Sequence, residues 1–265
     1  MLSSTYAPGS IFKIITSAAA IENIPDLYTR TWNCTGTKEI GGNKVTCTET
    51  HGEIDYKTAM SHSCNIAFAE MAVEMGRDVM NNTAKKAGIN KSYEVDDVDT
   101  AKGHFDVSKA DENQLAWSGI GQYDNAVNPM QMAMICGAIG NGGKAVNPTY
   151  IKGGSGDLLK LIGFNKPKEY DLFNSGTAQK LDEVMRYTVK DYYDYQRSGL
   201  FEGLSVCAKT GTAEVAGHDP TAWFAGFLKD KDHPYAFVVC IEDAGEALYT
   251  AAPLANSVLQ AAVNG

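Results

Sequence analysis

The sequence contains no apolar run long enough to cross a membrane as a helix. Its longest apolar stretches, Ala222 to Leu228 and Tyr235 to Ile241, have the length of strands, whereas a spanning helix needs about 18 apolar residues or more. The chain also opens without the basic start and apolar core of a signal peptide. Taken alone, these two absences would indicate a cytoplasmic protein.

Positive charge is in short supply. Lys and Arg number 23 against 32 Asp and Glu, so the formal net charge is −9. A protein that binds nucleic acid needs a basic face for the phosphate backbone. The composition therefore argues against a nucleic-acid partner.

Cysteine is sparse, and no CxxC pair, internal repeat or low-complexity tract occurs. Six scattered cysteines do not suggest a disulfide-dense scaffold, which a chain of 265 residues does not need. The remaining composition is globular, with 44% hydrophobic and 21% charged residues, so the chain can bury a large core. Cys136, Cys207 and Cys240 lie in apolar stretches and are expected inside that core.

Hydrophobic periodicity predicts mostly helices up to about residue 203. Ile11, Ile14 and Ile15 recur at helical spacing, and Pro8-Gly9 marks a turn just before them, which predicts a helix from Ser10 to about Glu22. Residues 31–52 are rich in Gly, Thr and Asn, which favours loops or short strands. Further helices are expected at 55–62, at 66–88 with an interruption at Gly76, at 128–139, and from Asn174 to about 189.

The last part of the chain changes to the periodicity of strands. Three β-rich runs, 204–215, 222–229 and 235–243, are separated by short turn segments and predict an antiparallel meander, followed by a helix at 253–263. The predicted fold class is α/β of the α+β type, an antiparallel sheet flanked by helices plus a helical subdomain. Residues 14–203 would form the mostly helical subdomain, and 204–265 the sheet meander and C-terminal helix.

Three short motifs occur in order along the chain. Ser10-Ile11-Phe12-Lys13 is S-x-x-K, Ser63-Cys64-Asn65 is S-x-N, and Lys209-Thr210-Gly211-Thr212 is K-T-G-T. Each motif is common on its own. The first is often a helix cap followed by a solvated Lys, the second a turn and the third a hairpin edge. Their surroundings therefore decide what they mean.

The surroundings of Ser10 and Lys13 favour a nucleophile with its base. Ser10 begins the predicted helix, where backbone N–H groups point outward and create a positive field. Lys13 follows three residues later on the same face, within an Ile-rich stretch. Burial there favours a neutral amine, and a neutral amine beside a serine can take its proton. The alternative is a Lys that extends its ammonium group to solvent.

Together the motifs resemble those of penicillin-binding protein transpeptidases, in the serine β-lactamase superfamily. The segment Tyr6 to Lys13 is similar to the nucleophile motif of that family, and the other two motifs follow in the family's order. The resemblance extends over nearly the whole chain, and it is strongest to the catalytic domain of a class B, monofunctional enzyme. Further matching segments are His51-Gly52, Gly119 to Gln122, Asn128 to Ala133, Asn141 to Gly143, and Trp223 to Gly226.

The resemblance implies roles for individual residues. Ser10 would attack the D-Ala-D-Ala carbonyl of a peptidoglycan stem peptide or a β-lactam ring, Lys13 would be its base, and Ser63 would relay a proton to the leaving amine. The acyl-enzyme would react with an amine of a neighbouring stem peptide, without a cofactor. Other cell-wall synthesis proteins are expected partners. The substrate would be bound by Asn65, Lys209, Thr210, Gly211 and Thr212, with the backbone N–H groups of Ser10 and Thr212 as the oxyanion hole.

A possible structural zinc site lies between the first two motifs. Cys34 and Cys47 are separated by 12 residues, and His51 follows shortly after Cys47, in a Gly- and Thr-rich segment. Two soft sulfur ligands and an imidazole suit tetrahedral zinc. Competing interpretations are a disulfide, two free thiols, or a plain turn at His51-Gly52. The fourth ligand would be Asp26, Glu49 or Asp55.

A group of tyrosines near residue 190 allows two interpretations. Tyr187, Tyr192, Tyr193 and Tyr195 lie close together in one acidic segment. They could line an aromatic groove for a glycan, but packing at a helix end is the expected arrangement.

The resemblance also implies a part of the fold that the sequence does not contain. In the family, two outer strands of a five-stranded sheet precede S-x-x-K, whereas nine residues precede Ser10 here. A three-stranded sheet would leave an unpaired edge. The chain is therefore expected to be an N-terminally truncated transpeptidase domain. The absent segment would carry a membrane anchor, which places the protein on the extracytoplasmic face of a bacterial cell membrane and overturns the cytoplasmic expectation.

Two other functions stay open within the superfamily. A class A β-lactamase needs an E-x-x-L-N loop, whereas the nearest match, Glu112 to Leu115, leads directly into Gly119-Ile120-Gly121. That placement fits a transpeptidase better. A β-lactam sensor, which is acylated once and then signals, would require a transmembrane partner module.

Overall fold

A three-stranded antiparallel sheet lies at the centre of the computed structural model, which describes residues 2–150 and 168–265. Strands β9 (Val206–Ala213), β10 (Thr221–Leu228) and β11 (Ala236–Ile241) are ordered β11-β10-β9. The predicted meander is thereby confirmed. All of β10 is buried, because it has a neighbour on each side and helices over both faces.

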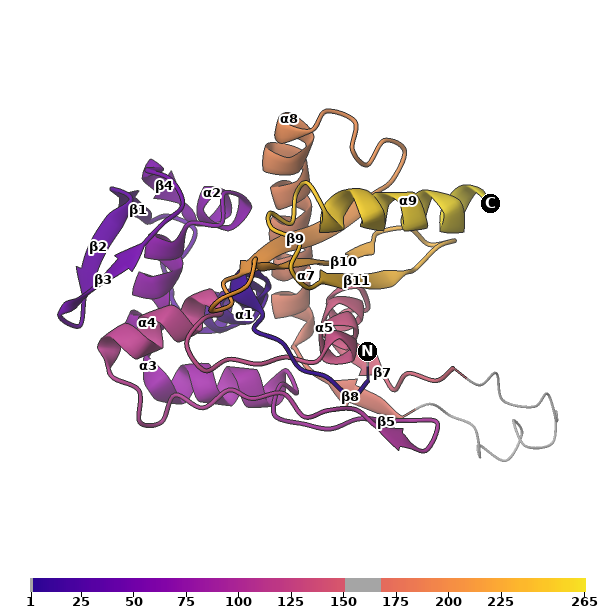
Figure 1. Ribbon diagram of the computed structural model, residues 1–265, viewed down its shortest axis with the longest axis horizontal. Helices are drawn as coiled ribbons and strands as arrows, with labels where there is room; N and C mark the ends of the chain where they lie inside the picture. The colour runs from indigo at the N-terminus through magenta and orange to yellow at the C-terminus, as the bar shows by residue number, and fades with distance from the viewer. Residues whose placement is uncertain (1, 151–167) are drawn as a thin grey trace.

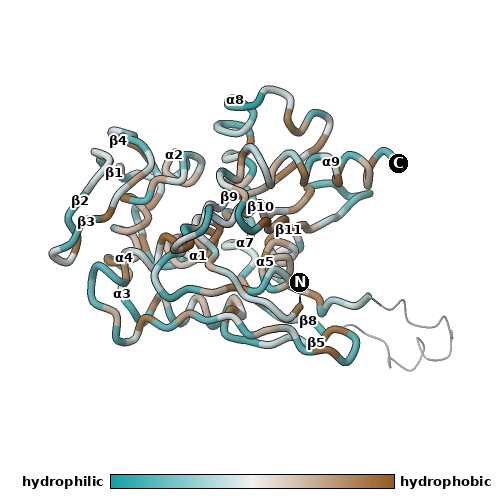
Figure 2. Tube along the Cα trace, viewed as in Figure 1, coloured by the Kyte–Doolittle hydropathy of each residue, from teal (hydrophilic) through white to brown (hydrophobic). Residues whose placement is uncertain are grey.

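Side chains of β10 alternate between two hydrophobic clusters, as the pleat of a strand requires. Trp223, Ala225 and Phe227 belong to the larger cluster, together with residues of α1, α5 and α7. Ala222, Phe224 and Leu228 belong to a smaller cluster formed with α9. Figure 2 shows hydrophobic residues gathered along the sheet and around α1. The sheet is therefore a middle layer, with α9 above it and α5 below it in Figure 1.

The helices that cover the sheet begin within two residues of the positions expected from the sequence. The Ser10 helix is divided into a 3₁₀ turn, η1 (Gly9–Phe12), and α1 (Lys13–Asn23). Asn128 and Asn174 act as N-caps, accepting hydrogen bonds from the N–H groups of Met130 at 2.9 Å and Thr177 at 2.8 Å. The helices concerned are α5 (Pro129–Gly140), α7 (Ser175–Thr188) and, on the other face, α9 (Ala251–Asn264).

Three further helices and two small two-stranded sheets form a second region, to the left in Figure 1. The predicted interruption of α3 occurs at Gly76, whose backbone has φ 77° and ψ 170°. Helix α4 was not predicted, although Asp111 and Gln114 form a capping box at its start. The elements are α2 (Tyr56–Ser61), α3 (Asn65–Lys86), α4 (Glu112–Ile120), β1 (Thr31–Cys34) with β4 (Gly52–Asp55), and β2 (Thr37–Ile40) with β3 (Asn43–Thr46).

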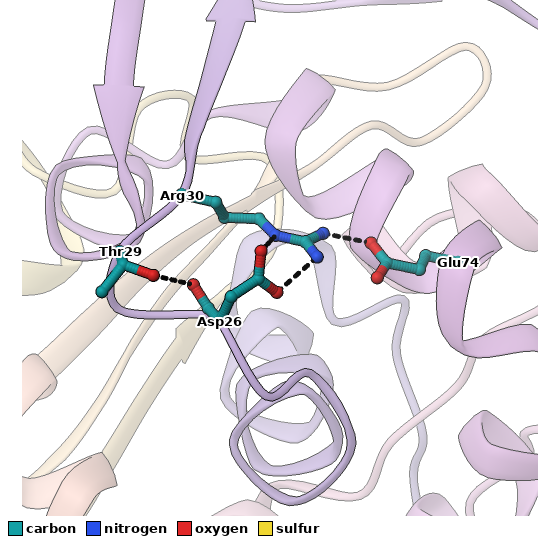
Figure 3. A network of polar contacts seen from close by, with 4 residues as sticks. All are labelled: Asp26, Thr29, Arg30 and Glu74. Atoms are coloured by element: carbon teal, nitrogen blue, oxygen red, sulfur yellow. Dashed lines mark hydrogen bonds and ion pairs between the residues drawn. The ribbon is translucent and has the colours of Figure 1, made fainter.

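An ion-pair network holds the start of strand β1 against helix α3. The guanidinium group of Arg30 lies between the carboxylates of Asp26 and Glu74, and the hydroxyl of Thr29 donates to the Asp26 carbonyl at 3.1 Å (Figure 3). Arg30 directly precedes β1, so the network orients the strand that ends at Cys34.

Short elements complete the described chain. Two two-stranded pairs join β5 (Glu94–Val95) to β6 (Val98–Asp99) and β7 (Lys144–Val146) to β8 (Glu169–Asp171). After α7 the chain continues as a π-helical turn, η2 (Val189–Tyr193), and then α8 (Asp194–Gln196). No helix among the described residues is both long and apolar enough to span a membrane.

Candidate active site

Ser10 lies in η1, which is pressed closely against strand β9. Gly9, with φ +51°, donates its N–H to the Gly121 carbonyl at 3.0 Å. A Cβ on Gly9 would come within 2.6 Å of the Thr212 carbonyl oxygen, and one on Gly121 within 1.9 Å of the Gly9 oxygen. Only glycine permits these approaches. They hold the half-buried Ser10 beside the K-T-G-T strand.

The side chain of Lys13 joins the first two motifs. It is fully buried, and its Nζ lies 3.0 Å from Ser10 Oγ and 3.0 Å from Ser63 Oγ. The same nitrogen donates to the Ser63 carbonyl oxygen at 2.6 Å and to Asn65 Oδ1 at 2.7 Å. Residues some 50 positions apart therefore meet around one amine.

The hydrogen bonds of Lys13 suit a neutral amine. Burial lowers the pKa of Lys13 to about 8, against a smaller opposing effect of Cys47 and Cys64. A neutral amine has two N–H groups and one lone pair. The Ser63 carbonyl and Asn65 Oδ1 can only accept, so they take both N–H groups. The lone pair is then left for a hydroxyl proton, and the Ser10 and Ser63 hydroxyls are both at hydrogen-bond distance.

The S-x-N loop links α2 to α3. Ser63 has φ 57°, a left-handed conformation that is unusual for a residue with a side chain. Asn65 begins α3, and its Nδ2 donates to the Thr46 carbonyl at 2.9 Å. Because the amide nitrogen is held there, Oδ1 is directed at Lys13.

The K-T-G-T motif occupies β9 at the edge of the described sheet. Lys209 is fully buried, and burial together with the charge of Lys13 lowers its pKa well below the usual value. A Cβ at Gly211 would meet Ile11 Cγ2 and the Pro8 oxygen at 2.9 Å, so glycine lets the strand approach η1. Thr210 and Thr212 alternate with these residues and are half-buried.

The backbone of β9 offers a donor beside Ser10. The N–H of Thr210 donates to the Tyr193 hydroxyl at 2.8 Å, and thus points away from the sheet. Residues two apart on a strand direct their N–H groups to the same side. The N–H of Thr212 therefore faces the same edge. At Ser10, in the first turn of η1, the N–H has no helical partner either.

All eight predicted catalytic and substrate-binding residues thus lie on η1, α1, the S-x-N loop and β9. The family profile described as the penicillin binding protein transpeptidase domain matches residues 1–260. The chain belongs to this family. The recognition made from the motifs and the mixed α/β fold class are both confirmed.

Two named bacterial proteins illustrate the similarity of sequence. Peptidoglycan D,D-transpeptidase PbpA of Mycolicibacterium smegmatis is 29% identical over 99% of this chain and 56% of its own length. Stage V sporulation protein D of Bacillus subtilis is 24% identical over 97% of this chain and 42% of its own. The chain therefore spans about half the length of the curated relatives that it matches.

Solved structures of this family superpose closely. Penicillin-binding protein A of Mycobacterium tuberculosis, as an imipenem acyl-enzyme complex, is 27% identical with a TM-score of 0.82, covering 99% of this chain and 61% of that one. Helicobacter pylori PBP2, solved in complex with MreC, shares the fold at 22% identity, with a TM-score of 0.78 over 97% of this chain and 50% of that one.

The predicted metal ligands also come together, with a different fourth member. Ligand atoms of Cys34, Cys47, His51 and Cys64 all lie within 4.8 Å of one another. Cys47 Sγ is 3.5 Å from His51 Nδ1 and 4.0 Å from Cys64 Sγ. Tetrahedral zinc holds its sulfur and nitrogen ligands roughly 3.5–3.8 Å apart, as Zn–S and Zn–N bond lengths require. This donor set therefore fits zinc.

The expectation that Asp26, Glu49 or Asp55 would be the fourth ligand was wrong. Asp26 pairs with Arg30, Asp55 caps α2 through the N–H of Thr58 at 2.8 Å, and Glu49 contacts Cys34 through its carbonyl. Cys64 takes the position instead, because the S-x-N loop turns its middle residue inward. The spacing C-x12-C-x3-H-x12-C contained this signal.

Sequence reasoning also missed contacts from η2. Asp191 accepts a hydrogen bond from Ser61 Oγ at 2.7 Å, and its carboxylate lies 3.6 Å from His62 Nε2, beside the S-x-N loop. Tyr193 contacts Thr210 on β9. The expected packing of tyrosines at a helix end holds for Tyr193, which is fully buried, but that expectation contained no polar role.

Proposed function

We propose that this chain is the catalytic domain of a peptidoglycan D,D-transpeptidase, which cross-links stem peptides through a serine acyl-enzyme and is acylated by β-lactams. The observation that carries the proposal is the Lys13 amine, which contacts the hydroxyls of Ser10 and Ser63 at 3.0 Å each. Acyl transfer by serine needs a base within hydrogen-bond reach of the nucleophile, and a second hydroxyl on the same amine can pass a proton to the leaving group.

Acylation begins at Ser10. Lys13 takes the Ser10 proton as the Oγ–carbon bond forms to the carbonyl before the terminal D-Ala. When the C–N bond then breaks, Ser63 donates its proton to the leaving amine and regains one from Lys13. The contacts at Ser63 Oγ allow this relay, since that hydroxyl and Ser10 share one amine.

Binding groups surround the reacting carbonyl. The N–H groups of Ser10 and Thr212 stabilise the oxyanion, and loss of one such donor costs about 2.7–4 kcal/mol of transition-state stabilisation. Lys209 and Thr210 receive the substrate carboxylate, which restores the charge of a Lys that burial disfavours. Asn65 orients both Lys13 and the substrate amide.

A β-lactamase is the second candidate, and the placement of Glu112 disfavours it. Glu112 is exposed at the first turn of α4. It lies beside Gly41, in the turn of the β2–β3 hairpin. No hydrogen bond connects Glu112 to Ser10 among the described residues. A hydrolytic base is needed beside the ester, and Glu112 does not supply one.

The experiment that tests the proposal is covalent capture of Ser10. After incubation with benzylpenicillin, intact-mass spectra should show one adduct per chain, and Ser10→Ala should show none. An adduct on another residue, or one that survives in Ser10→Ala, would overturn the assignment. Ser108→Ala, which removes an exposed hydroxyl, is the matched control and should label normally.

We further propose a structural zinc ion held by Cys34, Cys47, His51 and Cys64. Four protein ligands would leave no open position, so the ion would stabilise the fold rather than take part in the reaction. Because Cys64 is the middle residue of S-x-N, zinc would tie the loop of Ser63 to the paired strands β1 and β4.

Location and partners follow from the same proposal. A cross-linking enzyme must work where peptidoglycan lies, so we place the whole protein on the extracytoplasmic face of a bacterial membrane, with an anchor outside this sequence. Stem peptides and β-lactams are its small partners. Other cell-wall synthesis proteins are its macromolecular ones, in the way that Helicobacter pylori PBP2 was solved with MreC.

A further inference from the structure

The π-helical turn η2 contacts both the segment before the S-x-N loop and strand β9. Asp191 contacts Ser61 and His62, just before Ser63, and Tyr193 contacts Thr210 on β9. A second tyrosine, Tyr187, donates to Asp191 at 3.0 Å and braces it from α7. Single π turns recur at functional sites because they alter the direction of side chains within a helix.

Tyr193 makes two hydrogen bonds to the same residue of K-T-G-T. Its hydroxyl accepts the N–H of Thr210 at 2.8 Å and lies 2.9 Å from Thr210 Oγ1. The tyrosine is 1% exposed, so its hydroxyl group cannot turn to solvent. Its ring packs edge-on against Phe224, with centroids 6.0 Å apart.

The direction of the second bond follows from the need to satisfy a buried proton. An unpartnered buried hydroxyl costs about 1–3 kcal/mol. Among the described residues, Thr210 Oγ1 is the acceptor within reach of the Tyr193 proton, since the Thr210 N–H is itself a donor. Tyr193 therefore donates to Oγ1, and Thr210 keeps its own hydroxyl proton for another acceptor.

We propose that Tyr193 is a positioning residue that orients the Thr210 hydroxyl as a donor to the carboxylate of the incoming substrate. Tyr193 would not touch the substrate; it would act through Thr210, which is half-buried on β9 beside Lys209. Without Tyr193, the Thr210 hydroxyl would be free to present a lone pair, which repels a carboxylate. This inference rests on the proposed function, because it assigns part of the carboxylate site of that reaction.

The test is Tyr193→Phe, which removes the hydroxyl and keeps the ring. Second-order acylation constants are measured with benzylpenicillin and with its methyl ester, which lacks the anionic group. Tyr193→Phe should slow acylation by benzylpenicillin about 10-fold, the size expected for one bond to a charged group. Acylation by the ester should change less than about 2-fold. Equal slowing of both compounds would indicate a merely structural role and overturn the proposal, as would no change in either.

A second variant tests the coupling to Thr210. Thr210→Val removes the proposed donor, and adding Tyr193→Phe to it should cause no further loss, because both changes act through one hydroxyl. Additive losses would contradict the proposal. Tyr56→Phe, at another fully buried tyrosine that packs against Tyr28, is the matched control and should acylate normally. Absence of any Ser10 adduct in the unaltered protein would instead contradict the proposed function, so the two failures are distinguishable.

Discussion

Lys13 shows how one residue depends on its surroundings for its chemistry. Its nitrogen has four oxygen neighbours, two of which can only accept hydrogen bonds. These two acceptors fix the direction of both N–H groups of the neutral amine. The sequence predicted that Lys13 would be buried and basic. It could not predict the acceptor from the Ser63 backbone, because that contact depends on the left-handed conformation of Ser63.

The acylation rate should therefore rise with pH. Lys13 can take the Ser10 proton only when it is neutral, and its pKa is lowered to about 8 by burial. Below that pH the ammonium form predominates and acylation slows by about 10-fold for each pH unit. The first-order acylation rate at saturating benzylpenicillin, measured by stopped flow between pH 6 and about 9, gives the profile. A rate that falls with pH over this range would show that Lys13 acts as a cation instead.

Lys209 is predicted to serve in substrate binding. Lys209→Ala removes the cation that would meet the carboxylate, and acylation by benzylpenicillin should slow by about 10–100-fold, as expected for a charge-assisted bond. The fold should persist, as thermal unfolding can verify. Lys231→Ala is the matched control, since Lys231 is an exposed lysine in the turn between β10 and β11. If Lys209→Ala acylated at the normal rate, the K-T-G-T match would be no more than a strand edge.

At the scale of elements, the sequence predicted best where local chemistry decides. Asn128 and Asn174 are good caps, and they begin α5 and α7 as expected. The meander was predicted because its turns are polar and its strands apolar. Helix α4 was missed, since it is short and only its capping box marks it. Contacts between distant elements, such as η2 with β9, depend on packing that no local pattern encodes.

The cysteine cluster brings together residues from separate elements, and metal analysis can test whether it holds the proposed zinc ion. Protein purified without chelator should contain about one zinc per chain, and Cys34→Ser or Cys64→Ser should reduce this amount strongly. Removal of zinc should lower the midpoint of thermal unfolding, because the segments that carry the four ligands would no longer be joined through the ion. Cys136→Ala, at a buried cysteine of α5 outside the cluster, is the control. Metal-free protein with a Cys34–Cys47 disulfide in non-reducing peptide maps would exclude the zinc site.

At the scale of the whole molecule, the candidate active site lies where its two regions meet. The sheet supplies β9, the second region supplies the S-x-N loop, and η1 with α1 lies between them. The order of motifs along the chain predicted this assembly only through the family resemblance. The two further strands expected beside the meander are not among the described strands, and β11 lies at the other edge of the described sheet. The division into 14–203 and 204–265 stays a prediction, while α5 and α7 pack against the sheet.

The fate of the acyl-enzyme tests the molecule as a whole, because it depends on what surrounds the ester. Hydrolysis needs a base that activates water. Lys13 serves the forward step, and Glu112 is exposed at the start of α4. The adduct with benzylpenicillin should therefore persist, and nitrocefin should be consumed in a burst of about one equivalent with little steady turnover. Sustained hydrolysis of nitrocefin by the pure protein would make it a β-lactamase.

A β-lactam sensor would also keep its adduct, so a cross-linking assay on stem peptides must separate that function from a transpeptidase. A sensor would leave the peptides unchanged. A transpeptidase would join an acyl donor to the amine of a second stem peptide and release D-Ala.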